Sequence, residues 1–377
     1  MRPAPNSPTT DLRLAAIDHA RRIVIQEREA LTVNGLSPWV QRSWQRCLSF
    51  GFQPGEAVHF DLLSQAEMHR TMDANRQLVQ TARPLLEKLG QAISGTDYFA
   101  ILTNANGVVV DVNGQIDRSD RRASLITRIG VDLSESKIGT NAIGSALAEH
   151  QPVWLHRGEH FFNETSHYSC AGAPLFGPNG ACVGMLDVTG IDAVERPELK
   201  HLVAQCASKI ENALLLSKTH SLMIRLNWPG NTMGSDGDGM LCLDTDGMVM
   251  GANTIARQMV PNLTTPNLGA VHVSELFGVP AEFLFDAVRR SDPGIEIPLW
   301  SGLRLQALPV ERRYEERQTA GAVRPMVAQQ RPLKDIETAL IHKAVEQARG
   351  NVTAAARALG ISRATVYRKI GQKIQPR

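Results

Sequence analysis

The sequence is poor in the features that mark secreted, zinc-stapled and membrane proteins. Only five cysteines occur in 377 residues, and no two of them form a Cys-x-x-Cys pair. An odd number of widely spaced cysteines argues against both a disulfide framework and structural zinc. Nowhere do about 18 apolar residues follow one another, and the polar residues 1–10 lack the apolar core of an export signal. We therefore expect a protein of the reducing cytoplasm without a membrane partner.

The chain also has almost no net charge, but its basic residues are unevenly placed. Forty Lys and Arg residues and 38 Asp and Glu residues give a formal charge of +2, so the whole molecule is not a polycation that coats nucleic acid. From Pro332 onward, nine Lys and Arg residues stand against three Asp and Glu residues, a local charge of +6. Any affinity for DNA is therefore expected in this last part of the sequence.

Length and element order predict an α+β protein of several domains. A chain of 377 residues is too long for one core, and 43% hydrophobic with 21% charged residues is typical of globular proteins. The region 1–79 is expected to be helical, with an amphipathic helix over 12–30. A second helical block over 62–89 leads into the next domain, with Pro84 near a bend or a helix start.

Strand patterns follow in two regions. In the region 80–220 we expect a hairpin over 98–111, a helix over 140–150, a strand over 152–155, a second strand-turn-strand unit over 170–188 and a long helix over 198–216. A Gly-, Asp- and Ser-rich break over 229–239 then separates a smaller unit, 235–310, with a hairpin over 240–252, a helix over 254–259 and a strand near 303–308. The segment 311–331 is charged and poor in large apolar residues, and it is interpreted as a linker.

The region 332–377 has the pattern of a small all-helical DNA-binding domain. Apolar residues recur at helical spacing over 333–345, and the first helix is expected to stop at Gly350. Asn351 is placed to cap a second helix, and Gly360 supplies the left-handed residue of a tight turn before a third helix. The spacing is that of two helices joined by a short turn, the arrangement that places a recognition helix in the major groove.

The segment 350–370 closely resembles the Fis-type helix-turn-helix. In the predicted third helix, Arg363 and Thr365 lie near the start, where side chains reach base edges, and Arg368 and Lys369 are better placed for phosphates. The resemblance implies that the recognition helix approaches DNA through Ser362, Arg363, Thr365, Tyr367, Arg368 and Lys369, with Asn351 and Thr353 on the backbone. The partner would be double-stranded DNA at a promoter or enhancer.

Several motifs upstream resemble regulators of the acetoin-catabolism type. The opening Ser43-Trp44-Gln45-Arg46-Cys47 matches their first signature. The stretches 131–144, 158–161, 170–175 and 184–190 resemble the GAF domain of that family, which implies an α/β sensor that holds a small ligand or dimerises. The region 235–310 weakly resembles a PAS-type module.

Candidate effector-binding residues lie at a predicted helix start and in the His-rich stretch that follows. Gly139, Thr140 and Asn141 offer backbone amides and a hydroxyl to a polar ligand atom, or Thr140 and Asn141 merely cap that helix. His160 and Cys170 are the other candidates. Metal binding is disfavoured, although histidines occur at 150, 156, 160 and 167, because Pro152 and Gly158 interrupt any helix there. Cys170 is either an activated thiolate beside His167 or a buried structural cysteine.

These patterns together predict a regulator of transcription rather than an enzyme. Full-length relatives of the resembled type place an AAA+ ATPase between sensor and DNA reader, but this sequence has no Gly-x-x-x-x-Gly-Lys-Ser/Thr loop, and the stretch between Leu308 and Pro332 is too short for that domain. We expect a homodimer without a cofactor and without ATPase activity, responding to acetoin, a diol, an alcohol or a related compound. RNA polymerase or a complete sigma-54 activator would be a further partner. A thiol- or metal-based GAF enzyme or redox sensor and an architectural DNA-binding protein are the alternatives.

Overall fold

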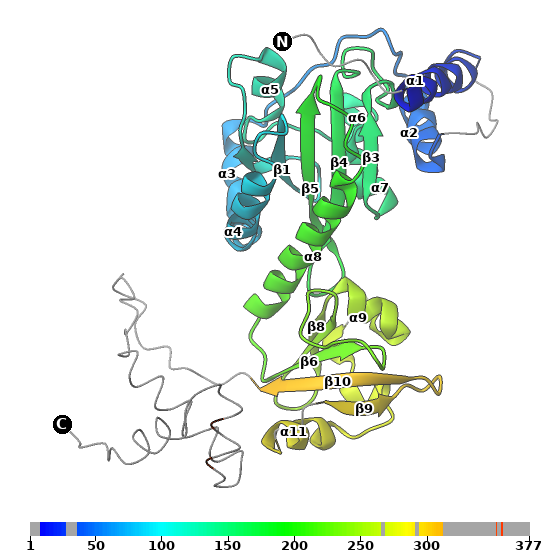
Figure 1. Cartoon of the computed structure of the whole chain (residues 1–377). Helices are drawn as coiled ribbons and strands as arrows, with labels where there is room; N and C mark the ends of the chain where they lie inside the picture. Colours follow the sequence, from blue (N-terminus) through cyan, green and yellow to red (C-terminus); the bar gives the residue numbers. More distant parts are fainter. Residues whose placement is uncertain are drawn as a thin grey trace. The chain divides into compact units, whose positions relative to one another are not determined.

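The computed structural model describes residues 8–27, 36–264, 268–290 and 294–311, together with Val352 and Ala356 (Figure 1). The chain divides into two compact units, residues 1–313 and 314–377. Two five-stranded antiparallel sheets lie in the first unit. Mixed α/β architecture is thereby confirmed for this part of the chain. In the described ranges, no helix combines the length and the apolar character needed to cross a membrane.

The first sheet has the strand order β2-β1-β5-β4-β3. Its strands are β1 (Tyr98–Asn104), β2 (Val109–Gly114), β3 (Val153–His156), β4 (Tyr168–Phe176) and β5 (Cys182–Ile191). The helices of this region are α3 (Gln65–Ala74), α4 (Arg76–Ala92), α5 (Arg121–Ile126), α6 (Glu135–Ile138), α7 (Ala142–Glu149) and α8 (Leu199–Ser217). Both predicted strand-turn-strand units and the long closing helix are confirmed.

Each face of the first sheet is buried in a separate apolar core, because successive side chains of a strand point to opposite faces. Ala100 and Leu102 of β1 pack in the core that contains α4 and α8. Phe99 and Ile101 pack in the opposite core, which contains Trp39 and other apolar residues of the N-terminal helices. This sheet is therefore covered on both sides, and the strands carry long runs of buried residues for that reason.

The N-terminal region consists of α1 (Pro8–Arg21), the short π-helix η1 (Arg22–Gln26) and α2 (Pro38–Ser49). Of the single helix predicted over 12–30, the part up to Arg21 is α-helical and the chain continues as the π-helix η1 to Gln26, while residues 28–30 lie outside the described residues. Of the two positions predicted for Pro84, the helix start is wrong, because Pro84 lies inside α4. A buried apolar face from Leu78 to Leu89 holds α4 together through the proline, whose local preference is outweighed by packing.

The second sheet has the order β8-β7-β6-β10-β9. It consists of β6 (Leu222–Asn227), β7 (Gly239–Leu243), β8 (Val249–Ala252), β9 (Ile295–Pro298) and β10 (Arg304–Glu311), with helices α9 (Thr254–Met259), α10 (Val273–Leu276) and α11 (Ala281–Arg289) and the 3-10 turns η3 (Pro261–Thr264) and η4 (Leu268–Ala270). The central strand β6 lies before the polar break over 229–239. The break therefore falls within the second sheet region and does not separate it from the first, contrary to the prediction from the sequence. The predicted hairpin and α9 are confirmed.

The two sheets are joined by contacts made from α8 (Figure 1). The Glu211 carboxylate on α8 accepts hydrogen bonds from the Phe176 amide at 3.0 Å and from the Thr254 hydroxyl at 2.7 Å. Asn212 accepts one from Asn253 at 2.8 Å. Two consecutive residues of α8 thus contact the end of β4 in the first sheet and the start of α9 beside the second sheet.

Candidate functional site

A small cavity lies between one face of the first sheet and the segment that leads into α7. Its volume is about 30 Å³, enough for a water-sized molecule, so a larger ligand requires its walls to move. The walls are mainly apolar. The lining residues are Phe60, Ile101, Ile126, Leu133, Ile138, Asn141, Ala142, Ile143, His160, Thr165, Tyr168, Cys170, Asp187 and Thr189.

A glycine on β4 makes room for this arrangement. Gly172 pairs with Asp187 of β5 in the sheet register. A Cβ atom on Gly172 would lie 2.1 Å from the Met185 methyl and 3.0 Å from the Ala142 carbonyl oxygen, which is closer than real side chains approach. The start of α7 therefore packs directly on the backbone of β4 beside Asp187.

Four polar side chains form a continuous buried series along this cavity. On β5, the Thr189 hydroxyl donates to Asp187 Oδ2. Thr189 Oγ1 lies 3.3 Å from Cys170 Sγ on β4, and that sulfur lies 3.6 Å from His160 Nε2. The other ring nitrogen of His160, Nδ1, lies 2.9 Å from the Arg157 carbonyl oxygen, to which it donates. This bond places the proton on Nδ1 and leaves Nε2 as an acceptor facing the thiol.

Burial sets the charge state of each group in this series. It lowers the pKa of His160 to about 4, so the imidazole is neutral at physiological pH. Burial, reinforced by the negative charge of Asp187, raises the pKa of the Cys170 thiol well above its usual range. Burial also raises the pKa of Asp187 to about 7, against the opposing effect of the Thr189 hydrogen bond. Cys170 is therefore a thiol, not the activated thiolate of a redox enzyme.

Three of the five predicted effector residues line this cavity, namely Asn141, His160 and Cys170. The Asn141 side chain caps α7 by accepting from the Gly144 amide at 2.9 Å, and it donates to the Gly139 carbonyl at 2.7 Å. Gly139 adopts a positive φ of 66° at the end of α6 and is not among the lining residues. Thr140 is completely buried but faces away from the cavity, toward α2.

Sequence reasoning missed Asp187 and Thr189 as members of the site. The available signal was a carboxylate in the middle of the otherwise apolar strand Met185-Leu186-Asp187-Val188. Asp residues are depleted in strands and are rarely buried without a partner, so this position required an explanation from the start.

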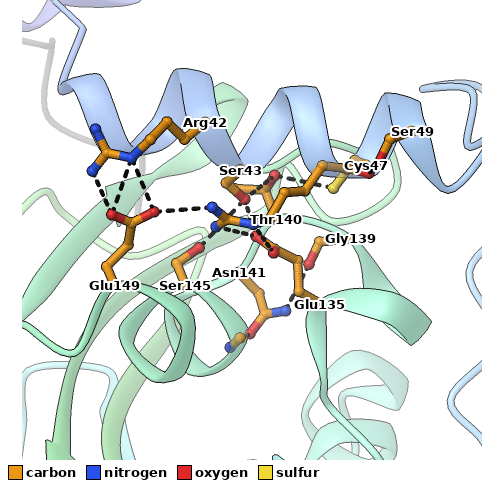
Figure 2. A network of polar contacts seen from close by, with 12 residues as sticks. Arg42, Ser43, Cys47, Ser49, Glu135, Gly139, Thr140, Asn141, Ser145 and Glu149 are labelled. Carbon is orange, nitrogen blue, oxygen red and sulfur yellow. Dashed lines mark hydrogen bonds and ion pairs between the residues drawn. The ribbon is translucent and has the colours of Figure 1, made fainter.

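Thr140 belongs to a polar network that attaches α2 to the first sheet region (Figure 2). Ser43 donates to the Glu135 carboxylate and lies 2.7 Å from the Thr140 hydroxyl. Arg46 Nε lies 2.6 Å from Glu135 Oε2, and its NH1 lies 3.0 Å from Glu149 Oε1. The Ser43 to Cys47 motif thus positions α2 against α6 and α7, the segment that also forms one wall of the cavity.

The histidines of the His-rich stretch point to different partners. His156 Nδ1 lies 2.7 Å from the Ser169 hydroxyl, and His167 Nδ1 lies 3.0 Å from Asp192. In the part of the chain that the structure describes, no three His, Cys, Asp or Glu side chains are grouped closely enough to hold a metal ion.

The predicted DNA-binding residues lie outside the described residues. This applies to Asn351, Thr353, Ser362, Arg363, Thr365, Tyr367, Arg368 and Lys369.

Comparison with protein families matches two stretches of the chain. Residues 16–212, which include the cavity, match the family described as MimR, N-terminal domain. Residues 332–372 match the family described as bacterial regulatory protein, Fis family. The Fis-type helix-turn-helix predicted from the sequence is confirmed by this second match.

Several curated proteins are similar to this chain. It is 31% identical over 257 residues to the acetoin catabolism regulatory protein of Cupriavidus necator, an alignment that covers 66% of this chain and 37% of that protein. It is 26% identical over 224 residues to the acetoin dehydrogenase operon transcriptional activator AcoR of Bacillus subtilis, an alignment that covers 59% of this chain and 37% of that protein. It is 27% identical over 222 residues to the propane 2-monooxygenase operon transcriptional activator MimR of Mycolicibacterium goodii, an alignment that covers 56% of this chain and 37% of that protein. The matches span little more than a third of each relative's length.

Among solved structures, the chain is similar to the one described as the crystal structure of the E. coli DhaR(N)-DhaL complex. The TM-score is 0.45 at 14% identity, covering 74% of this chain and all of that one. Of the three curated relatives, one is named as a regulatory protein and two as transcriptional activators. With more than half of its residues matched by one family model, the chain belongs to the MimR N-terminal domain family, and it carries a Fis-family regulatory segment.

Proposed function

We propose that this protein is a sequence-specific DNA-binding regulator of transcription that responds to a small molecule held in the cavity of the first sheet. The combination that carries the proposal is a Fis-family match at residues 332–372 and a MimR-family match at residues 16–212 in one chain. The names of the curated relatives support regulation of catabolic operons. The positive charge concentrated after Pro332 supports contact with a polyanion.

The sensor in this proposal is a GAF domain over 80–220. A five-stranded antiparallel sheet covered by helices on both faces, with a buried cavity on one face, supports that assignment. The PAS-like module proposed over 235–310 contains β7 to β10 of the second sheet, and the central strand β6 adds residues 222–227 to it. Residues 1–79 form the helical N-terminal region, 311–331 the linker and 332–377 the DNA-binding domain.

The proposed regulator acts as a homodimer. Two recognition helices then enter neighbouring major grooves about 34 Å apart, and an effector that changes dimer geometry changes how well both fit. Regulation without an ATPase in this chain would proceed by recruitment of RNA polymerase, by repression or in partnership with a complete sigma-54 activator. Acetoin, a diol or an alcohol is the first class of effector to test.

The experiment starts from duplexes selected for binding out of a random pool by the full chain. Binding of the selected duplex should weaken steeply with salt, because each phosphate contact releases a counterion. Arg363→Ala should reduce discrimination between selected and random duplexes by about 1 to 3 kcal/mol, because one bidentate contact to a base contributes that much binding free energy.

Arg289→Ala is the matched control for this substitution. It removes one positive charge from an exposed position at the end of α11, where Arg289 pairs with Asp286 at 3.0 Å. It should leave discrimination unchanged. If the full chain selects no sequence and shows no salt-sensitive retention of DNA, the proposed function is wrong.

A further inference from the structure

A count of hydrogen-bonding groups around the cavity shows a shortage of protons. The Tyr168 hydroxyl donates to the Arg122 carbonyl at 3.3 Å, and the Thr165 hydroxyl donates to the Phe162 carbonyl at 3.0 Å. Thr189 donates to Asp187, and the Asn141 amide donates to Gly139. The single hydroxyl protons of Tyr168, Thr165 and Thr189 are therefore engaged within the protein, as is one of the two amide protons of Asn141.

Acceptors remain in excess when Asp187 is ionised, which is the main state above its pKa of about 7. Asp187 is 1% exposed, and its Oδ1 has no hydrogen-bond partner among the described residues. Within the described ranges, His160 Nε2 has as its partner only the thiol of Cys170, at 3.6 Å, a weak donor that Thr189 also contacts. A buried carboxylate oxygen without a donor costs more than an ordinary missing hydrogen bond, so its retention beside a cavity requires a reason.

We propose that Asp187 recognises a hydroxyl group of a small neutral molecule bound in this cavity. This inference rests on the proposed sensory role of the cavity and names the residue that determines its selectivity. A hydroxyl donates its proton to the unpartnered Oδ1. A plain carbonyl compound has no proton for an ionised Asp187 and is repelled by it.

The walls define the rest of the ligand. Ile101, Ile138 and Ile143 present only apolar surface, so the remainder of the molecule is a short hydrocarbon. A cavity of about 30 Å³ admits such a molecule only when the walls separate, and the segment from α6 to α7 forms one of these walls. No Lys or Arg side chain lines the cavity, which disfavours a carboxylate or phosphate ligand.

The test compares ligands of one size that differ in a single group. The full chain is labelled at isoleucine δ1 methyls, and 2-butanol, butanone and 2-aminobutane are titrated at pH 8, where Asp187 is mainly ionised. We expect 2-butanol to shift the methyl signals of Ile101 and Ile143 at a concentration at least tenfold lower than butanone. The same signals confirm that each variant is folded.

Asp187→Asn is the discriminating variant because it keeps the shape and supplies an N–H that a carbonyl can accept. It should improve butanone binding at least threefold and bring the 2-butanol to butanone ratio below threefold, a gain that misfolding cannot produce. The matched control Asp111→Asn, the same substitution on β2 outside the cavity, should leave the ratio unchanged.

Three results overturn the inference: no shift of lining methyls by any of the probes, equal affinity for 2-butanol and butanone in the natural sequence, or tighter binding of 2-aminobutane, which would make the cavity a cation site. These failures are separable from failure of the proposed function. If the protein retains no DNA but its methyl signals shift as expected, only the regulatory role is contradicted. If it retains DNA but no methyl signal shifts, only the inference about the hydroxyl ligand is contradicted.

Discussion

The two sheets each bury an aspartate, and the contrast between them separates a structural carboxylate from a recognising one. Asp238, beside β7 of the second sheet, is 0% exposed and accepts from Arg225 at 3.2 Å, Asn227 at 3.0 Å and the Gly234 amide at 2.7 Å. Asp187 of the first sheet has one hydrogen bond, from Thr189, among the described residues.

The difference follows from the chain around each residue. The polar break over 229–239 folds back over Asp238 and surrounds it with donors, so the carboxylate organises that turn. Asp187 lies mid-strand between apolar neighbours, where no such loop reaches it. A satisfied buried carboxylate stabilises local structure, whereas an unsatisfied one costs stability and is retained for another purpose.

The largest expected effect is in the second sheet. Asp238→Ala leaves Arg225 and Asn227 without their buried acceptor, so we expect a loss of about 3 kcal/mol or more in the free energy of unfolding. Denaturant unfolding of the full chain measures it. Asp236→Ala, which removes an exposed surface pair with Lys209 at 3.4 Å, is the control and should cost less than 1 kcal/mol. Equal losses for the two variants would contradict a structural role for the buried Asp238 carboxylate.

An intermediate effect is expected at Asp187, where substitution should increase the relative free energy of unfolding as the pH rises. Because burial raises its pKa to about 7 from 3.8, the folded protein retains a proton that the unfolded chain has lost. The associated stabilisation is complete below pH 3.8 and disappears as the pH rises through 7. Asp187→Asn does not titrate, so its stability relative to the natural sequence should rise by about 2 to 3 kcal/mol from pH 5 to pH 8.

The comparison with the variant is necessary because neighbouring histidines titrate in the other direction. Burial lowers the pKa of His160 to about 4 and that of His156 to about 3, so each adds stability as the pH rises toward 6.5. These contributions are present in both proteins and cancel in the difference. A difference that does not change between pH 5 and pH 8 would mean that Asp187 has a donor.

The smallest expected effect concerns the attachment of α2 to the first sheet region. Arg46→Ala leaves Glu135, which is 8% exposed, with only its Ser43 partner, and we expect a loss of about 1 to 2 kcal/mol, reduced by the partial exposure of Arg46. Undocking of α2 would expose Trp44, whose fluorescence reports it. Arg42→Ala, on the same helix and more exposed, should have a smaller effect. A larger effect for Arg42 would contradict this network.

Much of the first sheet was predictable because its strands carry strong local signals. The hairpin of β1 and β2 is marked by a turn ending at Gly107, which adopts a φ of 82° that favours glycine. The pair of β4 and β5 is marked in the same way by Gly180. The strand β6 escaped detection because it lies between α8 and a polar break, and it is recognised as a central strand only by its pairing with β7 and β10.

The candidate site was predicted only in part. Asn141, His160 and Cys170 were recognised as chemistry-bearing residues, and they line the cavity. The separation of Thr140 from that group was not predictable, because one residue of backbone turns its hydroxyl toward Ser43 and Cys47 instead. Asp187 was marked in the sequence only as a carboxylate within an apolar strand, and the lack of a partner for its Oδ1 among the described residues is seen in the tertiary structure alone.

The sequence by itself determined the α+β class, the hairpins and the Fis-type segment, because turn residues, apolar periodicity and motif spacing act over a few neighbouring residues. Only the tertiary structure decided which buried polar groups share a cavity and that Thr140 points toward α2 instead. It also decided that Arg46 and Glu135 attach α2 to the cavity wall. Those outcomes depend on burial and on partners about 20 to 90 residues apart in the chain, and local propensities carry no information about either.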